Sequence, residues 1–235
     1  MFQNLLLIAV LVCALGSFSC ASRKPYSVKW AADCSTAGAR LAENWTALQE
    51  ARTDPGGCLS TSGVDRCEGL RAEIERLALA CPSDPPALLA NAVLAYDSRQ
   101  LAKAQQLLDH LLSLPQVHPE AAILRGRIAL EEGNVPFALR FLEQQVRLSP
   151  DRAGLRELYA SALFVAHDWK QATGELAIAE RLGAPKWRVA YHYGLLEEAA
   201  GNLTEAARRY QEALTERPAW KPAETRLAGL KARLP

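Results

Sequence analysis

The sequence contains little that is typical of an enzyme or of a nucleic-acid-binding protein. Its formal net charge is only +1, so no overall positive field would attract it to nucleic acid. Its four histidines are scattered, and no pair has the i, i+4 spacing of a helical metal site. It has no Gly-x-Ser-x-Gly turn, no glycine-rich phosphate loop and no Cys-x-x-Cys pair. We therefore expect a protein without enzymatic activity, cofactor, metal ion, small-molecule substrate or nucleic-acid partner.

Two local patterns could suggest chemistry, and each has a simpler interpretation. His192 lies between two tyrosines, but no carboxylate that could orient its ring is nearby in the sequence. We expect it to be a surface or partly buried histidine. Residues 131–132 and 197–198 are pairs of adjacent glutamates, which we expect at the solvated ends of helices.

The N-terminus resembles an export signal. Residues 5–18 form an uncharged apolar run that is short for a membrane span and close to the length of a signal-peptide core. The small residues 19–21 suit ordinary cleavage before Ser22, whereas the sequence GSFSC resembles a bacterial lipobox in which Cys20 is lipidated. The preceding MFQN lacks lysine and arginine, so an uncleaved membrane anchor is a third alternative. We expect an exported protein, either free in the periplasm or anchored to the membrane facing the periplasm.

The cysteines that would remain after processing support export. They are an even, clustered set, and in an exported segment such a set predicts two disulfides: Cys34, Cys58, Cys67 and Cys81. In a cytosolic protein the same set would instead suggest a metal site or catalysis.

The positions of these cysteines favour one pairing. Residues 37–52 and 64–81 predict two helices joined by the loop TDPGGCLSTSG. Cys67 and Cys81 are about four helical turns apart and share one face of the second helix, while Cys34 precedes the first helix and Cys58 follows it. An antiparallel hairpin would then form Cys34–Cys81 and Cys58–Cys67, although four cysteines allow three pairings.

A shift of 34 residues aligns four segments of the chain without a gap. Five columns recur in phase, and they hold small residues (Ala92, Gly126, Ala160, Gly194; Ala104, Ala138, Ala172, Ala206), large residues (Leu108, Leu142, Leu176, Tyr210; Leu101, Val135, Trp169, Leu203) and polar residues (Gln100, Asn134, Asp168, Asn202). Five columns in phase indicate a repeated structural unit rather than a chance match in an alanine-rich sequence.

Each unit is predicted to form two helices, as the second segment illustrates. Residues 119–132 and 136–148 predict helices, and Gly133 between them can adopt the left-handed conformation that ends a helix. Asn134 can cap the second helix, and Pro136 suits its first turn.

The small columns have a packing role. Two antiparallel helices approach closely only where side chains are short, so Gly126 and Ala138 are expected at the crossing, with Leu142 in the adjacent hollow.

This pattern resembles the tetratricopeptide repeat family over about residues 85–220. The period, the small residues at the eighth and twentieth positions, and the terminal prolines Pro150 and Pro218 carry the resemblance. It implies an all-α, right-handed α-solenoid of stacked antiparallel helix pairs. We expect a signal at 1–21, an N-terminal arm and disulfide-stapled helical hairpin at 22–84, and a C-terminal capping helix at 221–235, with four repeats between them: 85–118, 119–152, 153–186 and 187–220.

The resemblance also implies a partner-binding groove on the concave side. Positions that usually face the groove correspond to an apolar and aromatic set with a few charges: Val93, Tyr96, Ile123, Arg127, Leu130, Phe164, Arg188, Tyr191 and Leu195. The wider set of such positions includes Glu157, Ser161 and Glu198. Such a trough suits an extended peptide or an amphipathic helix. The basic and asparagine positions that hold a C-terminal carboxylate in some family members are absent, which argues against a receptor for chaperone tails.

We therefore expect an exported, non-enzymatic scaffold that binds a protein or peptide partner, by analogy in envelope, pilus or secretion assembly. The alternative is a structural or self-associating protein whose groove is filled by its own arm, residues 22–29, or by a second copy.

Overall fold

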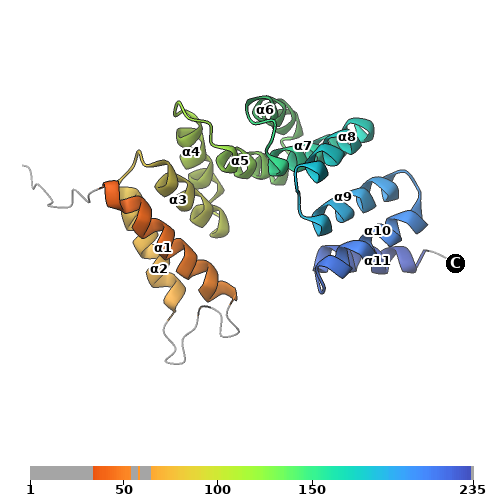
Figure 1. Ribbon diagram of the computed structural model, residues 1–235, viewed down its shortest axis with the longest axis horizontal. Helices are drawn as coiled ribbons and strands as arrows, with labels where there is room; N and C mark the ends of the chain where they lie inside the picture. Colours follow the sequence, from red (N-terminus) through yellow and green to blue (C-terminus); the bar gives the residue numbers. More distant parts are fainter. Residues whose placement is uncertain (1–33, 54–57, 59–64, 234–235) are drawn as a thin grey trace, which may run out of the picture.

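The computed structural model describes residues 34–53, 58 and 65–233. These residues form 11 helices and no strand (Figure 1): α1 (Cys34–Thr53), α2 (Arg66–Ala80), α3 (Pro85–Asp97), α4 (Leu101–Leu112), α5 (Pro119–Glu131), α6 (Val135–Leu148), α7 (Ala153–Val165), α8 (Trp169–Arg181), α9 (Lys186–Ala199), α10 (Leu203–Glu216) and α11 (Lys221–Lys231). The expected signal, its Cys20 and the arm at 22–29 lie outside the described residues. Among the described helices, none has the length and apolar character needed to span a membrane.

The turn between the two helices of each repeat has the same backbone geometry every time. Four residues at equivalent repeat positions have positive φ: Arg99 (60°), Gly133 (73°), His167 (63°) and Gly201 (83°). In all four turns the residue after the positive-φ residue donates its backbone N–H to the carbonyl five residues before it, at 2.8 to 3.0 Å. Only two of the four are glycines, so packing imposes the left-handed conformation on the arginine and the histidine. As predicted, the Asn134 side chain caps α6, by accepting from the Phe137 N–H at 3.3 Å.

The small-residue columns mark the helix crossings, as predicted. A Cβ on Gly126 would lie 2.6 Å from Leu142 Cδ2, and a Cβ on Gly194 would lie 2.5 Å from Tyr210 Cε1. Two equivalent glycines therefore meet two equivalent large residues in different repeats. This is direct evidence that the helix pairs are copies of one unit.

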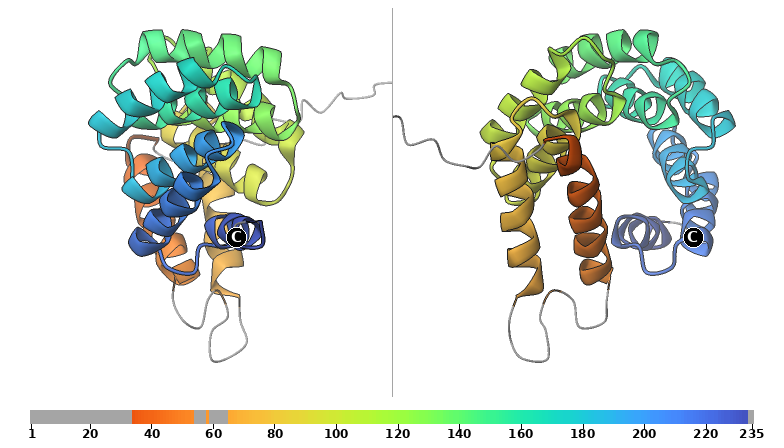
Figure 2. Two further views of the ribbon diagram at one scale, coloured as in Figure 1. Left: turned by 90° about the vertical axis from the view of Figure 1, so that its right-hand side faces the viewer. Right: turned by 60° about the vertical axis from the view of Figure 1, so that its left-hand side comes forward.

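The pairs stack into a curved solenoid. The first helices pack in one row, α1 on α3, α3 on α5, α5 on α7 and α7 on α9, and each also packs on the second helix of its own pair. The right-hand view of Figure 2 shows an arch, with the α1–α2 hairpin as one limb and α9–α11 as the other. The row of first helices lines the inner side of this arch. The predicted all-α solenoid of stacked helix pairs is confirmed.

The N-terminal hairpin closes one end of the solenoid. Its disulfides join Cys34 to Cys81 and Cys58 to Cys67, the pairing favoured by the sequence. Cys34 is the first residue of α1 rather than a residue before it, because the helix begins three residues earlier than expected. Leu48 and Ile74 are fully buried in a core that continues into α3.

Helix α11 closes the other end. Ala223, Leu227 and Leu230 are buried, while Lys221 and Lys231 are exposed. One face therefore covers the last repeat and the other meets solvent, which is the pattern that a solenoid end requires.

Candidate functional site

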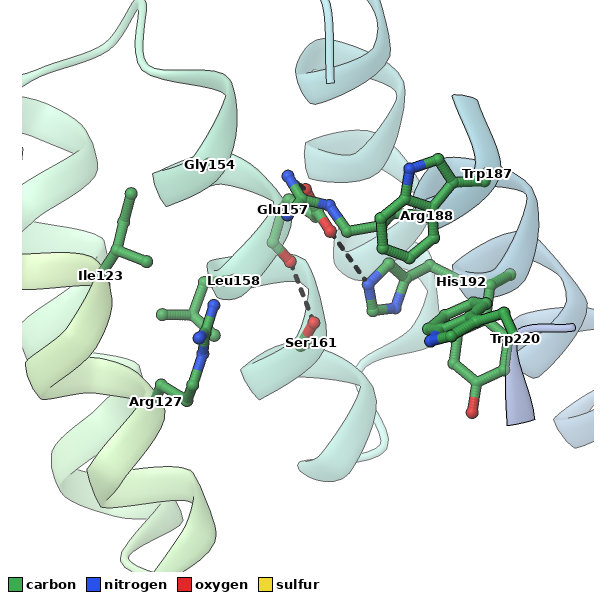
Figure 3. Close-up of a pocket in the computed structure, with 11 residues that line it drawn as sticks. Ile123, Arg127, Gly154, Glu157, Leu158, Ser161, Trp187, Arg188, His192 and Trp220 are labelled. Carbon is green, nitrogen blue, oxygen red and sulfur yellow. Dashed lines mark hydrogen bonds and ion pairs between the residues drawn. The ribbon is translucent and has the colours of Figure 1, made fainter. Parts of the chain in front are cut away.

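The concave side contains a cavity of about 340 Å³ between α5, α7 and α9. It is lined by residues from all three helices and by Trp220, the residue before α11 (Figure 3): Ile123, Arg127, Gly154, Glu157, Leu158, Ser161, Trp187, Arg188, Tyr191, His192 and Trp220. Four of the nine predicted groove residues are among them. The pockets that contain Val93 and Phe164 hold fewer of the predicted groove residues.

A buried carboxylate lies at the centre of the cavity wall. Glu157 on α7 is only 7% exposed. One carboxylate oxygen, Oε2, lies 2.9 Å from Arg188 Nη2, and Oε1 lies 3.3 Å from His192 Nε2 (Figure 3). Both partners come from α9, where residues four apart share a face. One carboxylate therefore fixes two nitrogen-bearing side chains.

The sequence places no orienting carboxylate near His192, but the structure supplies one from another repeat. Glu157 is remote in sequence, but the packing of α9 on α7 places it against the histidine ring. A search for local motifs could not find a contact made between two repeats. The expectation of a partly buried histidine is confirmed.

Glu157 and Arg188 do not use all of their hydrogen-bonding capacity. The ion pair between Glu157 and Arg188 lacks hydrogen-bond alignment, and the buried Nε of Arg188 has no hydrogen-bond partner among the described residues. Buried polar groups usually have such partners. Ser161, one turn after Glu157, donates its hydroxyl to the Glu157 carbonyl at 3.0 Å.

Arg127 supplies a second positive charge from the facing helix α5. It is exposed, lines the cavity opposite α9 (Figure 3), and makes no ion pair or hydrogen bond with any described residue. By contrast, its neighbour Arg125 pairs with Asp109 at 2.8 Å. With two arginines and one glutamate, the lining carries a net positive charge.

Aromatic side chains form the C-terminal edge of the cavity. The ring centroids of Trp187 and Trp220 are 4.6 Å apart, and those of Tyr191 and Trp220 are 4.7 Å apart. Arg217 lies over Trp187 at 4.3 Å. Neither tryptophan is among the predicted groove residues. Trp187 is near the start of α9, and Trp220 immediately precedes α11.

The other predicted groove residues do not join this cavity. Val93 lines a separate apolar pocket of about 480 Å³ between α1 and α3, with Leu41, Trp45 and Leu89. Phe164 and Leu195 line a smaller pocket of about 220 Å³, with Glu198 and Arg226. The structure thus divides the expected trough into separate hollows, and the central one combines apolar and aromatic side chains with the charged residues Arg127, Glu157 and Arg188.

Two of the predicted residues line none of these hollows. The Tyr96 hydroxyl donates to Glu131 of the next repeat, and burial followed by this carboxylate raises the pKa of the phenol. Leu130 is partly buried against the core of the second and third repeats. Both side chains therefore contribute to packing between repeats.

The expectation that the 197–198 pair is a solvated helix end is wrong for Glu198. Its carboxylate accepts a hydrogen bond of 2.8 Å from the buried Tyr210 hydroxyl and lies 3.5 Å from Arg226 of α11. Burial of Tyr210, together with this hydrogen bond and the negative charge, raises the pKa of its phenol strongly. With α11 packed onto the last repeat, only 20% of the Glu198 side chain remains exposed.

No protein-family model matches the sequence, and no curated protein matches it. Solved structures do match. TTC0263, a thermophilic TPR protein of Thermus thermophilus, has a TM-score of 0.63 and 18% identity, covering 83% of this chain and 97% of that chain. PilF of Pseudomonas aeruginosa has a TM-score of 0.63 and 15% identity, covering 86% of this chain and 92% of that chain. YrrB, described as a TPR protein with an unusual peptide-binding site, has a TM-score of 0.51 and 15% identity, covering 83% of this chain and all of that chain (100%).

These likenesses define the class of the protein. Stacked helix pairs with equivalent glycine crossings, together with structural similarity to several TPR proteins, show that the chain has the tetratricopeptide repeat fold.

Proposed function

We propose that this chain is a non-enzymatic scaffold that holds a segment of a partner protein against its concave side. The observation that carries the proposal is the cavity between α5, α7 and α9, which three successive repeats build from charged and aromatic side chains. Recognition sites of this kind combine an apolar wall with a few placed polar groups. The peptide-binding site named for YrrB is consistent with such a role for the fold.

Within this proposal the contact between Glu157 and His192 serves binding rather than catalysis. The same carboxylate is the counter-ion of Arg188, so its charge is shared between two partners. A buried charge in a protein is ordinarily paired in this way, without any catalytic role.

A photo-crosslinking experiment in the producing cell tests the binding role. A photoreactive phenylalanine analogue at Ser161, which lines the cavity, should form crosslinks to a distinct partner. The same analogue at Gln144, an exposed residue of α6 outside the cavity, is the matched control. Equal crosslinking from both positions, or crosslinking from Gln144 alone, would exclude the concave side as the binding surface.

We further propose that the chain is exported and works in the cell envelope. Two disulfides in the N-terminal hairpin suit an oxidising compartment, and residues 5–18 suit a signal-peptide core. Cys20 is the proposed lipid attachment site, and a role in envelope, pilus or secretion assembly rests on analogy. Intact-mass spectrometry should show loss of the signal, four oxidised thiols and, for the lipidated form, acyl chains on Cys20. A full-length mass with free thiols would contradict export.

Self-association is a second candidate, favoured by the apolar pocket between α1 and α3. That pocket includes Gly38, one helical turn after Cys34, which is the first described residue and follows the arm at 22–29 in the sequence. Light scattering of the mature protein with and without residues 22–29 tests this candidate. A dimeric mass in either form would support a second copy, and a change of hydrodynamic radius beyond that of the deleted residues would support the arm. A monomeric mass in both forms, with no such change of radius, would exclude both.

A further inference from the structure

We propose that the cavity between α5, α7 and α9 recognises the side-chain carboxylate of an aspartate or glutamate in the partner segment. This inference rests on the proposed binding function and names the ligand chemistry of the same site. It differs from the expectation drawn from the sequence, in which apolar and aromatic anchors fill a trough.

The charges of the lining select an anionic group. Arg188 is balanced by Glu157, but Arg127 on the facing helix has no ion-pair partner among the described residues. A lysine or arginine of a partner would approach two guanidinium groups, while the one carboxylate that could attract it is buried. A carboxylate would instead meet Arg127 directly, in the pairing for which a guanidinium is best suited.

The contacts of Arg188 keep its side chain in place before a ligand binds. The Glu157 side chain is only 9% exposed, and its two oxygens hold Arg188 at 2.9 Å and His192 at 3.3 Å. Arg188 itself remains about one third exposed, with a side-chain exposure of 35%, so it can reach a ligand as well as its counter-ion. Groups that are already ordered lose less conformational entropy when a ligand binds.

Unused hydrogen-bonding capacity is the second observation that points to a ligand. The buried Nε of Arg188 has no acceptor among the described residues, in a site where three side chains already converge. A guanidinium binds a carboxylate through parallel N–H donors. Arg188 Nε is buried as the side chain now lies, so a ligand carboxylate would pair with it only after the one-third-exposed Arg188 side chain turns toward the cavity. A ligand carboxylate would give Arg188 an acceptor that Glu157, without hydrogen-bond alignment, does not provide.

The aromatic edge predicts what accompanies the acidic residue. Trp187, Tyr191 and Trp220 line the same cavity, so an apolar or aromatic residue next to the carboxylate could pack on their rings. We therefore expect a motif of one acidic residue beside a large apolar one.

The test uses the mature, oxidised chain and a phage-displayed library of short random peptides, in which no peptide has a free C-terminal carboxylate. Selection should enrich peptides with an internal Asp or Glu. A selected peptide should lose affinity by about tenfold or more when that residue becomes Asn or Gln, and also when the protein carries Arg127→Glu. Arg140→Glu on α6, a charge-matched change at an exposed residue outside the cavity, should leave the affinity unchanged. A peptide with Lys in place of the acidic residue should bind Arg127→Glu better than it binds the unchanged protein.

The outcomes separate the ligand chemistry from the binding function. Enriched peptides without an acidic preference, whose binding is blocked by Ser161→Trp in the cavity, would overturn the carboxylate and leave the concave binding site standing. Binding that neither Arg127→Glu nor Ser161→Trp affects, or a selection that yields no peptide, would overturn both. Vesicles with anionic phospholipid that bind through Arg127 while acidic peptides do not would show a membrane ligand, and would also overturn the proposal. Circular dichroism and thermal melting confirm that each variant is folded.

Discussion

The two ends of the solenoid are closed by different interactions. At the N-terminal end, two disulfides join α1 to α2 and to the segments around them. At the C-terminal end, α11 is held by buried apolar residues and by a polar group in which Glu198 meets Tyr210 and Arg226. A terminal helix pair of a solenoid lacks a neighbour on one side, so each end needs additional stabilisation. The N-terminal hairpin lacks the repeat signature, and disulfides stabilise it. The last repeat has the signature, and the close packing of Gly194 on Tyr210 stabilises it.

The largest loss of stability is expected from changes at the N-terminal end. The Cys34–Cys81 disulfide closes a sequence separation of 47, and the Cys58–Cys67 disulfide closes one of 9. Because a longer loop loses more entropy on closure, replacing Cys34 and Cys81 by serine should lower the free energy of unfolding by about 4 kcal/mol. Replacing Cys58 and Cys67 by serine should lower it by about 3 kcal/mol. Urea unfolding measures both, and equal stability of all three proteins would show that packing alone closes this end.

The next effect compares two glycine crossings. Alanine at position 194 would place its Cβ within 2.5 to 3.1 Å of three ring atoms of the fully buried Tyr210, and we expect a loss of about 2 kcal/mol. Alanine at position 126 would meet mainly the terminal atoms of Leu142, which can move. There the gain in helix propensity, of up to about 1 kcal/mol, should offset most of the cost. Thermal melts in which Gly126→Ala is the more damaging change would contradict this account of the crossings.

A smaller effect concerns the buried phenol at the C-terminal end. Tyr210→Phe removes a hydrogen bond of 2.8 Å to Glu198 and should cost about 1.5 kcal/mol at neutral pH. The pKa of Tyr210 is raised in the folded protein, so above the ordinary tyrosine pKa of about 10 the unfolded chain loses its proton while the folded chain keeps it. The free energy of unfolding should therefore fall by about 1.4 kcal/mol per pH unit above pH about 10.

The phenylalanine variant is also the control for this pH dependence, because it should lack that part of the slope. Parallel slopes for the two proteins between neutral pH and the alkaline limit of the measurement would show that the folded pKa of Tyr210 is not raised.

The smallest effect is expected for the exposed partner of the same group. Arg226 lies 3.5 Å from Glu198, but half of its side chain (50%) is exposed. Arg226→Ala should lower the stability by less than about 1 kcal/mol, and by less still at high salt, because exposed ion pairs are weak and screened. A loss as large as that of Gly194→Ala would mean that charge rather than packing holds α11.

The sequence predicted features that depend on the period of the repeat. The columns at 126 and 194 indicated the crossings, and the residues around Asn134 indicated a turn and a cap that the structure contains. The left-handed conformation of Arg99 was not recognisable from its residue type, because arginine does not favour it. Histidine is enriched in this conformation among non-glycine residues, so His167 was the more recognisable of the two.

The site was predictable only in part. Periodicity indicated that Arg127, Arg188 and Tyr191 lie on first helices, and these three do line one cavity. The contact of Glu157 with His192 depends on how far α9 is rotated and shifted against α7, which no single repeat encodes. Trp220 is the last residue of the fourth predicted repeat and enters the site through the turn that leads into α11, so its position could not be read from periodicity.

Hydrogen exchange of the mature chain, with and without a peptide selected from the library, measures most directly where a partner segment lies. The account predicts slower exchange in α7 and α9 on peptide binding, with α6 and α8 unchanged. Slower exchange confined to α6, α8 or α10, or no change anywhere at saturating peptide, would contradict a binding site on the concave side.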